Sequence, residues 1–75
     1  MMWHKYYYLV DGRPSSVTLG EGEPTVLIQG EDGRFYEDLS VLDIILYGSD
    51  FRTSRVYHVV EVTYERFCQV TLGGV

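Results

Sequence analysis

Cysteine and histidine are the residue types in this chain that could supply a nucleophile and its base. Cys68 would have to lie within hydrogen-bonding reach of His58 or His4, because a catalytic thiol needs a base next to it. The apolar residues from Val56 to Leu72 fall mostly on even-numbered positions, which favours a half-buried antiparallel hairpin.

A turn at residues 65–67 of that hairpin keeps the apolar residues on one face and places Cys68 opposite Tyr64. His58 then lies roughly 20 Å farther along the strand, at ~3.3 Å per residue. We therefore expect no catalytic residue, a Cys68 that packs as a small apolar side chain, and a His58 at the edge of the core.

Metal binding is not expected either, because no His or Cys pair has the two-to-four-residue spacing of a zinc motif. The sequence predicts no metal and no cofactor. The one cysteine also excludes an intramolecular disulfide.

The acidic residues occur in pairs within predicted turns and strand ends. Exposure to solvent there disfavours acid–base catalysis, which needs two carboxyl groups in a cleft with different pKa values. These acidic residues are expected to be solvated, or to form an acidic surface that meets a basic partner. The residues concerned are Glu21, Glu23, Glu31, Asp32, Glu37 and Asp38.

An aromatic run near the N-terminus is the most unusual feature of the sequence. In an extended strand, Trp3 and Tyr7 lie on one face and Tyr6 and Tyr8 on the other, so some of these rings should be exposed. Exposed Tyr and Trp are typical of protein interfaces. The alternatives are partial burial under a helix, and stacking on single-stranded bases.

A second small group, Phe51 with Arg52 and Arg55, is a candidate recognition patch on the loop that follows the predicted helix. The more ordinary interpretation is that the two arginines keep this loop solvated. Both interpretations place these side chains at the surface.

The elements that must position these residues are mostly strands. The chain has ten Val, seven Tyr and no Ala, a composition that favours β-structure over a helical bundle. The expected strands are Trp3–Val10, Ser15–Leu19, Thr25–Gln29 and Arg34–Glu37, followed by those of the C-terminal hairpin.

One short helix is expected near residues 39–47, where Leu39, Leu42, Ile45 and Leu46 recur at helical spacing. Ser40 and Asp43 resemble a capping box, and Gly48 stands where a helix would end in the left-handed conformation. The β-branched residues of this segment leave a strand as the alternative.

We therefore predict a single small α+β domain over residues 1–75, with five or six short strands in a twisted antiparallel sheet. A small open barrel is the alternative architecture. A chain of this length spends most of its apolar residues on folding, which disfavours a deep substrate cavity and hence an enzyme.

The expected function is that of a non-enzymatic protein-binding module, such as a small acidic inhibitor or adaptor that a phage or mobile element directs at a host protein. The net charge of −5 favours a basic protein partner and disfavours nucleic acid. The alternatives are a self-assembling structural protein, with a homodimer formed through a sheet edge, and a module that binds single-stranded nucleic acid. No apolar run approaches the ~20 residues of a membrane span, and a cytoplasmic location is expected.

Overall fold

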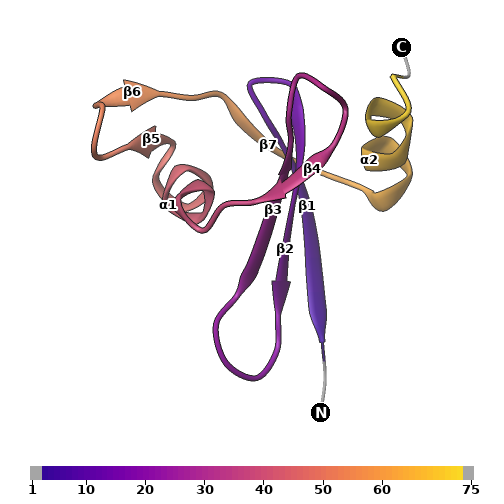
Figure 1. The fold of residues 1–75 in the computed structure, drawn as a ribbon, viewed down its shortest axis with the longest axis horizontal. Coiled ribbons are helices and arrows are strands. Elements are labelled where there is room, and N and C mark those ends of the chain that lie inside the picture. Colours follow the sequence, from indigo (N-terminus) through magenta and orange to yellow (C-terminus); the bar gives the residue numbers. More distant parts are fainter. Residues whose placement is uncertain (1–2, 74–75) are drawn as a thin grey trace.

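The computed structural model describes residues 3–73 and contains one five-stranded antiparallel sheet with a helix on each face (Figure 1). The strands of this sheet follow the order β4-β3-β2-β1-β7, so β4 and β7 form its two open edges. The elements along the chain are β1 (His4–Val10), β2 (Arg13–Leu19), β3 (Thr25–Gln29), β4 (Phe35–Glu37), α1 (Ser40–Tyr47), β5 (Ser49–Asp50), β6 (Arg55–Val56), β7 (Val59–Val62) and α2 (Tyr64–Thr71). This arrangement confirms the predicted α+β fold in its open-sheet form.

The β1–β2 hairpin follows directly from its turn sequence. Asp11 and Gly12 have φ values of 50° and 80°, and Val10 lies opposite Arg13. A two-residue loop with both φ angles positive matches the right-handed twist of the flanking strands, and Asp-Gly is one of its preferred sequences. The predicted turn is therefore confirmed.

The β3–β4 hairpin is confirmed as well. Gln29 lies opposite Phe35 across a loop in which Gly33 has a φ of 82°. The loop is also held by side chains, because Asp32 accepts a hydrogen bond from the Tyr36 hydroxyl on β4.

Helix α1 is confirmed over Ser40–Tyr47, but its N-terminus differs from the predicted capping box. Ser40 is the first helical residue, and its backbone N–H and its hydroxyl both donate to Asp38. The side chain that accepts from the backbone N–H at the start of the helix is therefore Asp38, which precedes Ser40. The C-terminus is as predicted, since Gly48 has a φ of 74° and its N–H donates to the carbonyl of Ile44.

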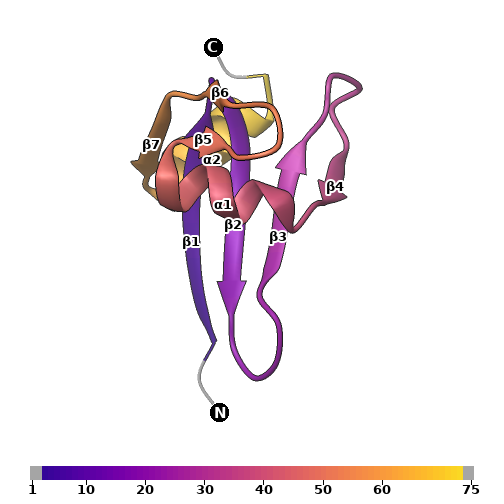
Figure 2. The same ribbon diagram turned by 90° about the vertical axis from the view of Figure 1, so that its left-hand side faces the viewer.

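The fully buried apolar core lies between α1 and the sheet. Its residues are Val10, Val17, Val26, Val41 and Ile44. The first three are contributed by adjacent strands, and the last two by the inner side of α1. Figure 2 shows α1 lying across this face of the sheet, with the short β5–β6 hairpin beside it.

The C-terminal segment corrects the sequence prediction. The expected hairpin with its turn at residues 65–67 is wrong, because the segment after β7 is the helix α2. Thr63 caps this helix, its Oγ1 accepting from the backbone N–H of Arg66 at 3.1 Å. The even-numbered apolar pattern ends with β7, which pairs with β1 and places Val62 opposite Tyr7.

Helix α2 packs on the opposite face of the sheet from α1 (Figure 1). The ring of Phe67 lies 4.7 Å from that of Tyr7 on β1 and 5.8 Å from that of Phe35 on β4, measured between centroids. A cap at Thr63 and an apolar residue at the fourth helical position are together typical of a short helix that docks by one face.

Candidate functional site

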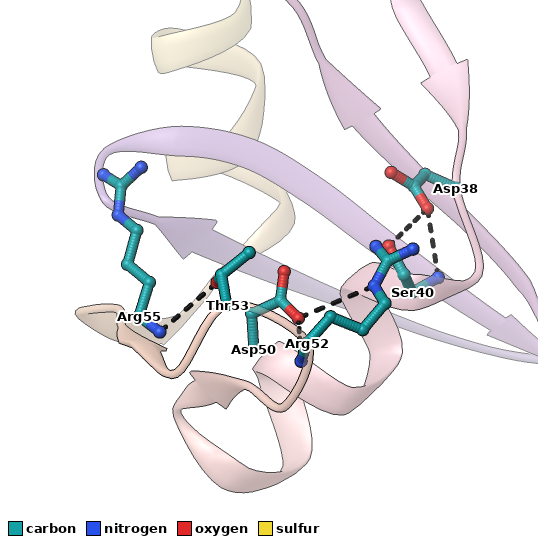
Figure 3. Close-up of polar contacts among 6 residues, drawn as sticks. All are labelled: Asp38, Ser40, Asp50, Arg52, Thr53 and Arg55. Carbon is teal, nitrogen blue, oxygen red and sulfur yellow. Dashed lines mark hydrogen bonds and ion pairs between the residues drawn. The ribbon is translucent and has the colours of Figure 1, made fainter.

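Three segments that are distant in sequence meet around a charged cleft of about 240 Å³. The β1–β2 turn contributes Asp11 and Arg13, the start of α1 contributes Asp38, and the β5–β6 hairpin contributes Asp50 with two arginines. Apolar core residues of the sheet and of α1 line the rest of the cleft, with Tyr57 beside them. Figure 3 shows the side chains of the hairpin and of the α1 start around this site.

Each of the three carboxylates at the cleft already holds backbone in place. Asp11 accepts a hydrogen bond from the backbone N–H of His58 at 2.7 Å, and Asp50 accepts one from that of Arg52 at 2.9 Å. Asp38 accepts from the backbone N–H of Ser40 at 3.0 Å. Asp38 and Asp50 therefore stabilise the helix start and the hairpin locally, and Asp11 joins the β1–β2 turn to the segment that enters β7.

The three guanidinium groups at the cleft are much less engaged. Arg55 donates from Nη2 to Asp11 at 3.3 Å and lies 4.6 Å from the centre of the Tyr57 ring. The Nε atom of Arg52 lies 3.8 Å from Asp50, and 75% of the Arg52 side chain is exposed. Within residues 3–73, Arg13 forms no ion pair. Most of the guanidinium donors at the cleft are therefore open to solvent.

An exposed apolar surface adjoins the cleft. Leu46 and Tyr47 at the end of α1 are 62% and 64% exposed, Phe51 in the hairpin loop is 64% exposed, and Val56 on β6 is 78% exposed. The rings of Tyr47 and Phe51 lie 5.1 Å apart. We call these four residues the α1–hairpin surface.

The α1–hairpin surface exists because α1 is apolar around almost its whole circumference. Six of its eight residues are apolar, the exceptions being Ser40 and Asp43, yet only Val41 and Ile44 are fully buried. A helix that is apolar all round is normally covered on all sides. Part of α1 is therefore left without cover in the described chain.

The α2 face carries an open groove of about 280 Å³ lined largely by aromatic rings. Tyr7 is half-buried there, with its ring 5.1 Å from that of Tyr64 and 4.7 Å from that of Phe67. The neighbouring Cys68 thiol, and after it the Tyr7 hydroxyl, raises the pKa of Tyr64 above its ordinary value. Lys5 is the one cationic residue that lines this groove.

The aromatic residues of β1 alternate between the two faces as predicted. Tyr6 lies opposite the core residue Val17, and the half-buried Tyr8 packs against the core. Trp3 is 60% exposed, and its ring lies over Gly20, where a Cβ atom would collide with it. The predicted interface residues of β1 are thus divided between two faces and do not form one patch.

The six predicted acidic residues are not gathered on one surface. Glu21 and Glu23 lie in the β2–β3 loop, and Glu31 and Asp32 lie in the β3–β4 loop at the opposite end of the strands (Figure 2). The remaining two, at positions 37 and 38, lead into α1. The hydrogen bond from Tyr36 lowers the pKa of Asp32 below its ordinary value.

The histidines and the cysteine do not meet. The His58 side chain is exposed in the connection between β6 and β7, which corrects its predicted place at the edge of the core. His4 is exposed on β1, and Cys68 is half-buried in α2. No group of three metal-ligating side chains occurs in the part of the chain that the structure describes.

Comparison with known proteins finds no matching family model, no matching curated protein and no matching solved structure. Within residues 3–73, neither helix has the length and apolar character that crossing a membrane requires. The geometry of the surfaces themselves is therefore the basis for any functional argument.

The sequence pointed to Arg52 and Arg55 of the cleft and to the adjoining Phe51. It did not point to the parts of the cleft and the groove that come from distant segments. Arg13 gave no local signal, because its role depends on the turn lying beside the hairpin. Phe67 could have been found from the Thr63 cap and its three-residue spacing from Tyr64.

Proposed function

We propose that this protein is a non-enzymatic protein-binding module whose contact surface is the α1–hairpin surface. The observation that carries the proposal is the exposure of four large apolar side chains on one helix and the hairpin beside it. Contiguous exposed apolar side chains on a small protein mark interaction sites.

The composition of the surface supports a protein partner. Tyr and Phe rings bury a large apolar area while losing few rotamers, and arginines are enriched with them at interface centres. Tyr47 and Phe51 already lie together, and Arg52 follows Phe51 directly. A partner would gain both an apolar contact and a charged one at this place.

The net charge of −5 acts at longer range and favours a partner whose surface is basic overall. An acidic chain of this kind would serve as an inhibitor or adaptor, covering a functional surface of another protein. Such a role needs no catalytic group in this chain.

The test is affinity capture from lysate of the source cell with tagged wild-type protein, with and without nuclease. We expect one stoichiometric protein that survives nuclease. Replacing a central contact residue, Phe51→Ser, should weaken its retention by about 30-fold, corresponding to roughly 2 kcal/mol.

Leu72→Ser is the matched control, because Leu72 is also exposed but lies at the end of α2 on the other face of the sheet. This variant should retain the partner like the wild type. Recovery of the chain alone, or of material that nuclease removes, would contradict the protein-binding proposal.

Self-assembly through the β7 edge is a second candidate, supported by the backbone geometry of that strand. The Asp11 N–H donates to the His58 carbonyl at 2.8 Å, and bonded and non-bonded pairs alternate along an antiparallel ladder. The backbone groups of Val59 and Glu61 therefore point away from β1 toward the open edge. A second copy could pair there with Val59 opposite Glu61.

Sedimentation of the purified protein over a hundredfold dilution tests this candidate. Glu61→Pro removes an outward N–H without removing a bond to β1, so it should convert a dimer to a monomer. A wild-type protein that sediments as a monomer at every concentration excludes assembly through this edge.

A further inference from the structure

We propose that the charged cleft is a carboxylate-binding site, and that it takes the side chain of an Asp or Glu from the protein partner. That the carboxylate belongs to a protein partner rests on the proposed function. That the cleft binds a carboxylate does not depend on it.

The balance of donors and acceptors at the cleft carries the proposal. A guanidinium group has five N–H donors, so Arg13, Arg52 and Arg55 together present about fifteen. One hydrogen bond from these three groups, Arg55 to Asp11, links them to another side chain within residues 3–73. A ligand that supplies acceptor oxygens would satisfy donors that are otherwise left to water.

The three acids at the rim equal the three arginines in charge, yet they take up few of the guanidinium N–H donors. Asp38 and Asp50 each accept a backbone hydrogen bond from their own segment, and Asp11 accepts one from His58, so their positions are explained by the fold. Asp50 is also the weaker of the two ion-pair partners, because 3.8 Å separates it from the Nε atom of Arg52. The exposed Arg52 side chain is therefore free to turn toward a ligand.

The distribution of cationic residues is uneven for a chain with so few of them. Three of the six Lys and Arg residues line this one cleft, although the net charge of the chain is −5. Folding brings them together from two separate segments, the β1–β2 turn and the β5–β6 hairpin. A single guanidinium group can bind a planar carboxylate through two parallel hydrogen bonds.

The size and surroundings of the cleft favour a carboxylate side chain over a larger or more highly charged ligand. Its volume of about 240 Å³ lies below the roughly 300–1,000 Å³ of most small-molecule sites. Because three carboxylates offset the three guanidinium groups, the cleft has no net positive charge that would favour a doubly charged phosphate over a singly charged carboxylate. The apolar residues below the rim can accommodate the methylene groups of an Asp or Glu side chain.

The cleft is also continuous with the proposed contact surface. Phe51 belongs to the α1–hairpin surface, and its two neighbours in sequence, Asp50 and Arg52, both line the cleft. One partner segment with an apolar residue next to an acidic residue would therefore occupy both. The contacts with Asp11 and Tyr57 fix the position of the Arg55 guanidinium group at the edge of the cleft.

The experiment follows the arginine Nε–H signals of the full chain by NMR during titration with glutarate at constant pH and ionic strength. We expect saturable shifts of the Arg13, Arg52 and Arg55 signals. Arg34 and Arg66 lie outside the cleft and serve as internal controls, whose signals should move little and without saturation. Inorganic phosphate is titrated in parallel and should bind more weakly.

Two substitutions with opposite expected effects sharpen the test. Arg52→Gln should weaken glutarate binding about tenfold, whereas Arg66→Gln should leave it unchanged. Asp50→Asn should strengthen binding several-fold, because it removes a competing charge while an amide oxygen can still accept from the Arg52 N–H. Equal, non-saturating shifts of all five arginines, or tighter binding of phosphate, would overturn the carboxylate site.

Retention of the captured protein by different variants distinguishes the carboxylate site from the protein-binding function. Loss of the partner in both Phe51→Ser and Arg52→Gln, with retention in Arg66→Gln, supports the Asp or Glu of the partner as the ligand. A partner that is lost in Phe51→Ser but retained in Arg52→Gln and Arg13→Gln overturns this ligand and leaves the protein-binding function standing.

Discussion

Arg55 and Asp11 are joined by an ion pair of 3.3 Å between Nη2 and Oδ2, although they are 44 residues apart in the sequence. The same carboxylate accepts the backbone N–H of His58 through its other oxygen. Asp11 thereby ties the β1–β2 turn both to the β5–β6 hairpin and to the segment that enters β7. It fixes the position of the hairpin on which the cleft and the α1–hairpin surface depend.

Asp11→Ala should lower the free energy of unfolding by about 2 kcal/mol. Alanine loses the hydrogen bond to the His58 N–H, and it tolerates a φ of 50° less well than Asp, whose short polar side chain favours the left-handed region. Urea denaturation measures the change.

Two further variants apportion the effect of Asp11. Asp11→Asn keeps an acceptor and tolerates the left-handed conformation, so it should cost less than about 1 kcal/mol. Arg55→Gln removes only an exposed ion pair and should cost about 0.2–1 kcal/mol. A loss in Arg55→Gln as large as in Asp11→Ala would show that the ion pair, and not the backbone bond, holds the turn.

Gly48→Ala should lower the stability of the domain by about 1–2 kcal/mol through backbone conformation alone. Gly48 ends α1 with a φ of 74°, and nothing lies within 4 Å of where a Cβ would be. Thermal or urea denaturation detects the loss, and Gly48→Asn should recover part of it. An unchanged stability would mean that α1 can end in another conformation.

Phe67→Ala should detach α2 from the sheet and cost about 1–2 kcal/mol, because its half-buried ring contacts both Tyr7 and Phe35. Amide hydrogen exchange of residues 64–71 should accelerate more than that of the α1 segment. Gln69→Ala is the control on the exposed side of the same helix, and it should leave exchange unchanged. Equal acceleration in both helices would indicate that α2 unfolds only together with the whole domain.

Tyr8 should make the domain less stable in alkaline solution. Burial, the Glu61 carboxylate and then Tyr6 raise the pKa of Tyr8 above the usual value of about 10. A raised pKa means that the folded state holds its proton more tightly, so this contribution is complete below pH ~10 and is lost as the pH rises through the higher folded pKa. Denaturation at pH 8 and above 10 measures the decline.

Tyr8→Phe should flatten that alkaline decline, and Glu61→Gln should move the titration of Tyr8 back toward its usual range. The ionisation of Tyr8 can be followed by NMR in the wild type and in Glu61→Gln. A decline of the same size in Tyr8→Phe would assign the alkaline sensitivity to another group.

Local sequence determined the elements whose signals are contained within a few residues. The Asp11-Gly12 turn, the Gly33-containing hairpin and the end of α1 at Gly48 each depend on a residue that tolerates a positive φ. Such a conformational preference acts on the residue itself, whatever surrounds it. The alternation of the tyrosines on β1 likewise followed from the two-residue period of a strand.

The C-terminal helix was misread because its apolar residues satisfied two periods at once. Tyr64 and Cys68 share an even parity and also a four-residue helical spacing. What decides between them is the Thr63 cap and the docking of Phe67 against Tyr7, and the second of these exists only after β1 has joined the sheet.

The sequence by itself thus predicted an α+β domain with an antiparallel sheet, a short helix near residues 39–47 and aromatic residues on both faces of its first strand. Only the tertiary structure decided which side chains meet. Arg13 and Arg55 come to one cleft, and Tyr7 and Phe67 to one groove, through strand pairing and helix docking between distant segments. Turn and period signals are local properties of the backbone, whereas a binding site is a property of segments that folding brings together.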